Sequence, residues 1–292
     1  MSLQSLALEL LSALTSAAGL FVVASGITLV FGAMRIINLA HGSFYMYGAF
    51  FMSTLIGAAS SGWFWLALVA VPLAVALLGV AVDLLVLRRV YAKEHLLQLL
   101  ATYALLLILA ALGLRIWGVA ERTVSPPPLV AGKVAVLEAS FPAYNFFVVG
   151  AALVVGLGLW LLLKRTLLGW HIRAAVEDPE TLAAGGANVP MLFTAVFGLG
   201  ALLAGLGGAL IAPLQAIAPG MDVSIIVSAF IVAVIGGLGS VAGAALGAVI
   251  IGLFEALGTL WAPTWASAFV FLAMIIVLVV RPSGLLGTAG SE

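Results

Sequence analysis

The segment "AMRIINLAHGSFYMYGAF", residues 33–50, places side chains capable of chemistry inside an otherwise apolar part of the chain. Asn38, His41 and Ser43 can donate and accept hydrogen bonds, and Gly42 tolerates a break in helical structure. A serine activated by a histidine would be a hydrolytic nucleophile. Here the two residues stand two positions apart at an expected helix start, where serine more often caps the helix. We therefore expect no hydrolytic enzyme at this segment.

Signatures of other catalytic chemistry are missing from the sequence. The 292 residues include no cysteine and three scattered histidines, and neither H-E-x-x-H nor G-x-x-x-x-G-K-[ST] occurs. The stretch "GGLGSVAG", residues 236–243, has the spacing G-x-G-x-x-x-G and lies between apolar segments. That setting favours packing glycines over a dinucleotide-binding turn. The sequence thus predicts no enzyme, no metal and no cofactor.

The composition places these residues in a membrane protein. Hydrophobic residues make up 65% and charged residues 8% of the chain, against roughly 45–50% and about 25% in an ordinary soluble domain. Charge-free windows are long enough for helices of about 20 residues, and they are continuously apolar, whereas barrel strands alternate. We predict an all-α integral membrane protein with a single transmembrane domain, residues 1–292, built as a polytopic bundle of 8–9 transmembrane helices. The expected spans are 10–33, 42–60, 63–87, 97–117, 142–163, 190–212, 223–236, 240–261 and 264–280.

Two places in this bundle are expected to hold broken or short helices, near 34–43 and near 223–240. Fourteen helical residues cover about 21 Å, less than the roughly 30 Å hydrocarbon core. A short segment can still cross where protein or a cavity surrounds it. We expect residues 223–236 to cross; the alternative is a re-entrant segment, which would move the C-terminus to the other side.

The basic residues predict the orientation, because short cytoplasmic loops are enriched in lysine and arginine. Two loops separated by two spans carry most of them, so both are expected in the cytoplasm. Counting spans from these loops puts the N-terminus outside and residues 164–189 inside. The residues are Arg88, Arg89 and Lys93 in one loop and Lys164, Arg165 and Arg173 in the other.

The two breaks resemble each other. Gly-Ser opens a helix of small residues at Gly42-Ser43 and again at Gly239-Ser240, and both helices are expected to run in the same direction, as in parallel repeats. Interrupted helices at matching places in two halves point to a transport site. The alternatives are a chance recurrence of Gly-Ser and, for the first break, a capped turn between spans. The candidate residues for a translocation path or gate are Asn38, His41, Gly42, Ser43, Gly236, Gly237, Gly239 and Ser240.

Small residues also recur at every fourth position, as in Gly239, Gly243 and Gly247. Ala201, Gly205 and Ala209 repeat the pattern. Such faces allow helix backbones to approach closely. We expect close packing within the chain, with a dimer contact as the alternative.

The loop 164–189 contains a helix-start signature. Asp178 can cap free N–H groups, Pro179 suits the first turn, and Glu180 suits the positive end of the helix dipole. The following "PETLAA" predicts one or two helical turns, ended by Gly185-Gly186. This segment is either an ordinary connector or a helix presented to a cytoplasmic partner.

Four motifs resemble one known family. They are "GITLVFGAMRIINLAHGSFYMYGAF" (26–50), "RAAVEDPETLAAGGANV" (173–189), "IVAVIGGLGSVAGAALGAVIIGLFEAL" (231–257) and "RPSGLLG" (281–287). Together they resemble permease subunits of the branched-chain amino acid ABC transporters, in particular the shorter, LivH-like permease. The resemblance covers nearly the whole chain, with the motifs in the expected order.

The resemblance implies a permease subunit in the inner membrane of a prokaryote, driven by ATP hydrolysis on separate ATPase subunits. It implies a second permease, homologous or identical, and an extracytoplasmic solute-binding protein, with no nucleic acid. Its substrates would be branched-chain or other small apolar amino acids, with urea or short amides as the alternative. The loop residues expected to dock the ATPase are Arg173, Glu177, Asp178, Pro179 and Glu180.

Two residues depart from the family pattern: Ser43 stands where an acidic residue is common, and Trp170 where an arginine is common. The first leaves the local charge of the site open. The second leaves Arg173 as the loop's only basic residue after Gly169, so docking would depend on the acidic residues.

A secondary carrier or channel is the competing class. Ion-driven carriers need ionisable groups within the membrane, and the candidates Asp83, Arg115, Asp222 and Glu255 fall near expected membrane edges. This position disfavours ion coupling. We expect Arg115 to pair with Glu255, and Asp222 to cap the helix 223–236 or, alternatively, to face the substrate.

Overall fold

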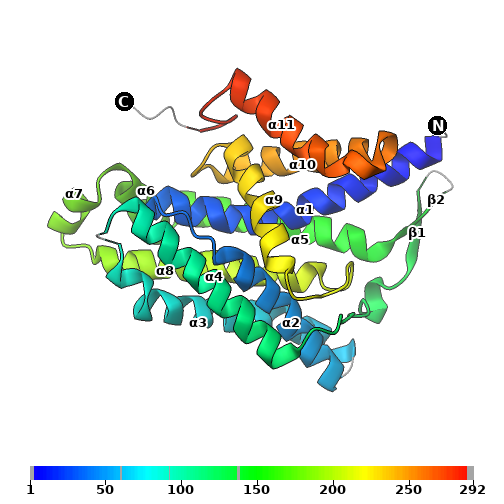
Figure 1. Ribbon diagram of the computed structural model, residues 1–292, viewed down its shortest axis with the longest axis horizontal. Helices are drawn as coiled ribbons and strands as arrows, with labels where there is room; N and C mark the ends of the chain where they lie inside the picture. The colour runs from blue at the N-terminus through cyan, green and yellow to red at the C-terminus, as the bar shows by residue number, and fades with distance from the viewer. Residues whose placement is uncertain (1–2, 60, 92, 137–138, 288–292) are drawn as a thin grey trace.

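The computed structural model describes residues 3–59, 61–91, 93–136 and 139–287. Within these ranges helices dominate, and the elongated bundle is shown in Figure 1. The helices are α1 (Leu3–Met34), α2 (His41–Ala59), α3 (Phe64–Leu85), α4 (His95–Trp117), α5 (Ala143–Arg165), α6 (Leu167–Glu177), α7 (Pro179–Ala184), α8 (Val189–Ile211), α9 (Met221–Gly236), α10 (Val241–Trp261) and α11 (Ala266–Val280).

The prediction of an all-α polytopic membrane protein is confirmed. Seven helices are long and apolar enough to cross a membrane, and α2 and the shorter α9 also fall on expected spans. The ends of the helices differ from the expected spans by a few residues, except that α1 begins earlier, at Leu3. Charge-free windows located the helices because a charged side chain is costly at membrane depth.

A small hairpin was not expected from the sequence. Strands β1 (Lys133–Val136) and β2 (Ala139–Pro142) pair antiparallel, with Lys133 opposite Pro142. They lie in the connection between α4 and α5. Strands of four residues give too short a pattern to be recognised as alternation.

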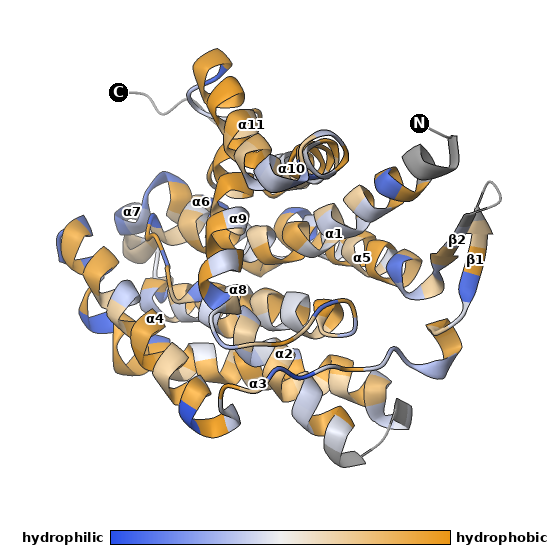
Figure 2. Ribbon diagram, turned by 45° about the vertical axis from the view of Figure 1, so that its right-hand side comes forward, coloured by the Kyte–Doolittle hydropathy of each residue, from blue (hydrophilic) through white to orange (hydrophobic). Residues whose placement is uncertain are grey.

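Helix α1 forms the centre of the bundle. In its apolar window 83% of the residues are buried, against 17% in α5 and 6% in α11. Figure 1 shows α1 running through the middle, with α11 at the edge, and in Figure 2 the outer helices are hydrophobic along most of their length. This arrangement is what a bilayer requires, because lipid solvates outward leucine and valine side chains while backbone groups bond within each helix.

Small residues bring the central helices together within the chain. Side chains on Gly243 and Gly247 would overlap the backbone of α9, and a Cβ on Gly205 would come within 2.7 Å of Val75 Cβ on α3. The expected intramolecular packing of these small-residue faces is therefore confirmed. A separate close approach joins α2 to α8, where a Cβ on Gly48 would overlap the backbone of Gly205.

The α2–α8 approach yields a stability prediction. Gly48→Val is expected to lower the melting temperature of the detergent-solubilised protein by several degrees, because overpacking costs about 1–3 kcal/mol. Gly57→Val is the matched control on the same helix, since no described atom lies within 4 Å of a Cβ built there. Equal melting temperatures for the two variants would contradict this account of the packing.

Helix α9 returns the chain between two helices that run in the same direction. Figure 1 shows α8 and α10 both leading away from the end of the bundle that holds α6 and α7. In Figure 1, α9 lies across the long axes of α8 and α10, and whether residues 223–236 cross the membrane or re-enter stays a prediction. After α11 the chain lies beside the last turn of α9, where the Leu285 and Leu286 amides donate to the carbonyls of Ile235 and Gly236 at 2.8 and 2.9 Å.

The directions of α2 and α10 agree with parallel repeats. Helix α10 runs antiparallel to α1: a Cβ on Gly32 would come within 2.9 Å of Gly239 Cα, and Gly252 lies against Ala13. Helix α2 runs alongside α4 in the same direction, and Figure 1 shows α2 and α10 both pointing away from the α7 end. Whether the two halves are true repeats stays a prediction.

Candidate functional site

The first expected break forms a junction between the starts of α2 and α9. Helix α1 ends at Met34 and is followed by Arg35, a non-glycine residue with φ of 54°; the chain then enters α2 at His41. Ser43 Oγ donates to Asp222 Oδ2 at 3.4 Å. A side chain on Gly42 would overlap the Asp222 backbone, so glycine allows the two helix starts to touch.

Buried polar groups surround this junction. His41 is fully buried, and its Nε2 donates to the Val23 carbonyl at 3.1 Å. Asn38 Oδ1, His41 Nδ1 and Asp222 Oδ1 are buried and have no hydrogen-bond partner among the described residues. Unpartnered polar atoms are costly in a dry interior, which makes this junction unlike ordinary helix packing.

The expectation that Asp222 caps α9 is wrong. Gly220, with φ of 94°, is the N-cap, and no side chain caps the helix there. Because α9 begins at Met221, Asp222 falls in the first turn, and its carboxylate turns toward α2 instead. There it faces the positive dipole ends of two helices, which favour a negative charge.

This geometry answers the question of charge raised by Ser43. The carboxylate of Asp222 approaches the Ser43 hydroxyl from α9. An acidic group is therefore present beside residue 43, although residue 43 itself is neutral.

The second expected break lies at the other end of α9. Gly237 and Gly239 have φ of 100° and 92°, conformations that side chains disfavour, and Ser240 caps α10 by accepting from the Gly243 amide at 3.0 Å. His41 packs on Gly26 of α1 and Gly239 packs on Gly32, six residues or about 9 Å apart along that helix. The two groups of candidate residues thus lie on neighbouring turns of α1, the first beside the start of α9 and the second at its end.

A cavity of about 290 Å³ opens among α1, α2, α9 and α10. It combines hydroxyl and amide groups with apolar side chains and one carboxylate, and Gln215 Nε2 donates to Tyr45 Oη at 2.8 Å across its wall. Its lining consists of Ser16, Gly19, Leu20, Tyr45, Ile211, Gln215, Met221, Ser224, Ile225, Ser228 and Glu255.

The cavity adjoins the first break without containing it. None of the eight candidate path residues, all within the described ranges, lines the cavity. Tyr45 and Met221 do, and they stand two residues after Ser43 and one residue before Asp222. The α2–α9 junction thus lies directly behind the cavity wall.

The expected pairing of Arg115 with Glu255 is not formed. Both residues are described, and no ion pair joins them: Glu255 lines the cavity on α10, whereas Arg115 lies near the end of α4, on the opposite side of the bundle in Figure 1. The sequence placed Arg115 and Glu255 at a similar depth in their spans, but it could not show that other helices lie between α4 and α10.

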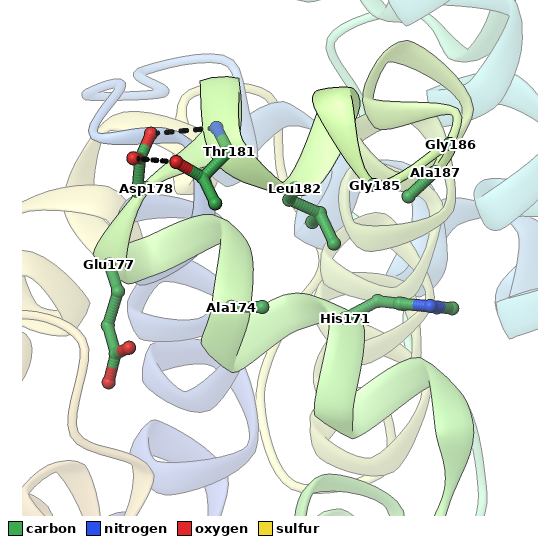
Figure 3. A pocket seen from close by; sticks show the side chains of 9 residues that line it. All are labelled: His171, Ala174, Glu177, Asp178, Thr181, Leu182, Gly185, Gly186 and Ala187. Atoms are coloured by element: carbon green, nitrogen blue, oxygen red, sulfur yellow. Dashed lines mark hydrogen bonds between the residues drawn. The ribbon is translucent and has the colours of Figure 1, made fainter.

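The loop 164–189 folds into two helices that enclose a groove of about 560 Å³ (Figure 3). Helix α6 was not expected; Thr166 caps it by accepting from the Gly169 amide at 3.2 Å. Helix α7 and its ending at Gly185-Gly186 follow the sequence prediction. The groove is lined by His171, Ala174, Glu177, Asp178, Thr181, Leu182, Gly185, Gly186 and Ala187.

The five docking candidates play different structural roles. Glu177 and Asp178 line the groove. The Arg173 guanidinium donates to the Leu163 carbonyl and lies 5.4 Å from the Trp170 ring centroid. Pro179 and Glu180 form the first turn of α7 and do not belong to the groove lining among the described residues.

Comparison with known proteins identifies the family. Residues 9–279 match the family model described as "Branched-chain amino acid transport system / permease component". The chain belongs to this family. Family membership, together with the long apolar helices, makes it a transport permease of the inner membrane that crosses several times, and not an enzyme.

Curated branched-chain amino acid permeases align with this chain over nearly its full length. The high-affinity branched-chain amino acid transport system permease protein BraD of Pseudomonas aeruginosa is 29% identical over 293 residues, covering 96% of this chain and 95% of BraD. LivH of Escherichia coli K12 is 27% identical over 279 residues, 91% and 90% of the two chains. The fructose import permease protein FrcC of Rhizobium meliloti is 30% identical over 148 residues, 47% and 40% of the two chains. No solved structure matches the chain.

A polar network in this permease connects the groove region to the bundle. Arg88 Nη2 donates to Thr194 Oγ1 at 2.8 Å and to the Pro190 carbonyl at 3.4 Å. Thr194 Oγ1 donates in turn to Asp83 Oδ2 at 2.6 Å. The network joins the end of α3 to the first turns of α8, and α8 directly follows the groove in the chain. Asp83 is therefore held in a structural contact with Thr194.

The permease also yields a pH prediction at the groove. Hydrogen bonds from the Thr181 side chain and amide, together with the Glu180 amide, hold the pKa of Asp178 below its ordinary value of 3.8. The cap is thus fully present above pH 3.8 and is lost only as the pH falls through the lowered pKa. At pH 7, Asp178→Ala should speed hydrogen exchange at the Glu180 and Thr181 amides several-fold, whereas Asp178→Asn, which can still cap, should not. Wild-type exchange in Asp178→Ala would contradict the cap.

Proposed function

We propose that this chain is the permease subunit of an ABC importer for branched-chain or other small apolar amino acids. One observation carries the proposal within the family: a cavity that combines polar and apolar groups opens at the broken helices α2 and α9. Its volume of about 290 Å³ falls near the lower end of the 300–1,000 Å³ range of small-molecule sites. ATP hydrolysis occurs on separate subunits, because the sequence has no phosphate-binding loop.

The path begins at the cavity and continues through the α2–α9 junction. Ser43 and Asp222 meet there behind Tyr45 and Met221. Separating the two helix starts would open a passage inward from the cavity, and Asn38 and His41 would then line its first part. Gly236, Gly237, Gly239 and Ser240 form a second flexible point at the far end of α9.

A second permease, identical or homologous, completes the path. Gln215, Ser224 and Glu255 are exposed in the single chain although they lie on membrane-spanning elements or beside them. Polar and charged side chains at membrane depth face protein or water rather than lipid. A partner permease packed over α1, α9 and α10 would enclose them.

The groove between α6 and α7 receives the ATPase. It lies at the end of the bundle that carries Arg88, as the bonds from Arg88 to α8 indicate, and short basic loops mark the cytoplasmic side. The N-terminus then lies outside and residues 164–189 inside. Glu177 offers a free carboxylate at the rim, since Figure 3 shows it pointing away from α7.

Coupling follows from the order of the chain. Closure of the ATPase pair moves α6 and α7, and α7 leads into α8 within five residues. Helix α8 packs on α1, α2 and α3, so a shift of α8 reaches the junction. An external solute-binding protein delivers the amino acid to the cavity from the other side.

The test is reconstitution of the permease with its ATPase, partner permease and binding protein in liposomes. We expect the ATPase to co-purify and leucine uptake to require ATP. Uptake that persists without any ATPase would favour a secondary carrier or channel and overturn the proposal. Uptake of urea, an amide or fructose, but not of leucine, would refute the substrate class.

A further inference from the structure

Glu255 is the one formal charge among the residues that line the cavity between α1, α2, α9 and α10. It lies on α10, about 9 Å from the helix end at Trp261. No lysine, arginine or histidine belongs to this lining as the structure describes it. The cavity therefore favours a ligand with a positive group, because an opposite charge offsets the cost of keeping a carboxylate at membrane depth.

The charged side chains near Glu255 are consistent with a preference of the cavity for a positively charged ligand. Glu9 on α1 is a second carboxylate at the outer end, where its Oε1 accepts from Thr259 Oγ1 at 2.8 Å. The basic residue that reaches the adjoining loop is Arg122, whose backbone pairs with Ile217. Its guanidinium donates to the Trp117 carbonyl at 3.3 Å and does not line the cavity as described.

The rest of the lining suits a small amino acid. Leu20, Ile211, Met221 and Ile225 present apolar surface for an aliphatic side chain. Ser16, Ser224 and Ser228 carry hydroxyl groups. Those of Ser224 and Ser228 donate to the Met221 and Ser224 carbonyls at 3.0 and 3.3 Å, and each would exchange this bond to donate to a carboxylate. The lining thus combines one anion, hydroxyl groups and an apolar wall, which complement a zwitterion with an apolar side chain.

We propose that Glu255 binds the α-amino group of the transported solute and makes an ammonium group a requirement for passage. This inference rests on the proposed function, because it assigns the recognition of the same substrate within the permease itself. It makes the cavity selective against 2-oxo acids, which have the same side chain and carboxylate but no amine. It also makes Glu255 a specificity-determining residue, in addition to the selection made by the binding protein.

The first experiment compares ATP-dependent leucine uptake by the reconstituted complex with Glu255→Gln, Glu255→Asp and Glu9→Gln. Glu255→Gln should lower the initial rate at least tenfold, and Glu255→Asp should retain part of it. Glu9→Gln is the matched control, since it removes a nearby carboxylate outside the cavity, and its rate should stay within twofold of wild type. If wild type takes up no amino acid, the proposed function fails; if wild type is active and Glu255→Gln equals it, this inference fails alone.

A second readout separates recognition from folding. The chain has no cysteine, so Ser228→Cys places a single thiol in the cavity wall. Leucine should slow its modification by a small thiol reagent at least threefold, and 4-methyl-2-oxopentanoate should not. Adding Glu255→Gln, or Glu255→Asp if the former does not fold, should remove or weaken the protection by leucine. Equal protection by the oxo acid, or undiminished protection in the Glu255→Gln background, would overturn the proposal.

Discussion

Replacing Ala174 with tryptophan is expected to abolish both co-purification of the ATPase and ATP-dependent leucine uptake. Ala174 lines the groove between α6 and α7, and an indole there occupies space that a partner side chain would enter. Aromatic and other large side chains buried in pockets dominate the energetics of such interfaces. Filling the pocket should therefore reduce ATPase binding by at least tenfold, while the transmembrane bundle, which this residue does not support, stays folded.

The control for this variant lies on the same helix. Val176 is exposed on α6 and is not part of the groove lining, so Val176→Trp adds the same indole outside the groove. We expect normal ATPase binding and uptake from Val176→Trp. Loss of binding in both variants would show that α6 tolerates no bulk at all, and retention in both would remove the groove from the docking surface.

The membrane helices could be predicted because each long one is set by a local property, the absence of charge over a continuous window. The end at Gly185-Gly186 and the cap at Asp178 were predicted for the same reason, since a cap depends on residues within one turn. Helix α6 was missed because Leu167–Glu177 is short and carries His171, Arg173 and Glu177 within a loop rich in charge, so it read as part of a connector. Its signal was present: Gly169, Ile172 and Ala175 recur at helical spacing and form its buried face.

The cavity could not be predicted, because it depends on which distant segments meet. Ser16, Tyr45, Ser224 and Glu255 come from four helices, and nothing in the local sequence indicates that they face one space. The same limit produced the expected pairing of Arg115 with Glu255. Depth along a span can be counted from the sequence, whereas the direction of a side chain around the bundle cannot.

The first break illustrates what the sequence did indicate. Polar residues between two apolar runs correctly marked an unusual place, and the structure adds the partner that explains it. Asp222 on α9 is fully buried against the start of α2. A contact of 3.4 Å is a weak hydrogen bond, and one carboxylate oxygen has no described partner. A loosely satisfied contact between two helix starts costs little to separate, which is what a gate requires.

Joining these two helix starts covalently is expected to block transport reversibly. The side chains of Ser43 and Asp222 meet at 3.4 Å, so Ser43→Cys combined with Asp222→Cys should bring two sulfur atoms within reach of a disulfide after a small adjustment. Because the chain has no native cysteine, oxidation would form this bond alone within the permease. If separation of α2 and α9 is the inner gate, the oxidised protein should lose at least tenfold of its ATP-dependent leucine uptake.

Reduction supplies the control within the same protein. Uptake should recover when the disulfide is reduced, and each single cysteine variant should be insensitive to oxidant. The loss must appear with the ATPase still bound, because the cross-link lies far from the groove between α6 and α7. Full uptake in the cross-linked protein would show that α2 and α9 move together, and the passage would then have to open elsewhere. Separation of the two helix starts is thus a physical step that one covalent bond can prevent, because the absence of a side chain at Gly42 lets the two helix starts touch.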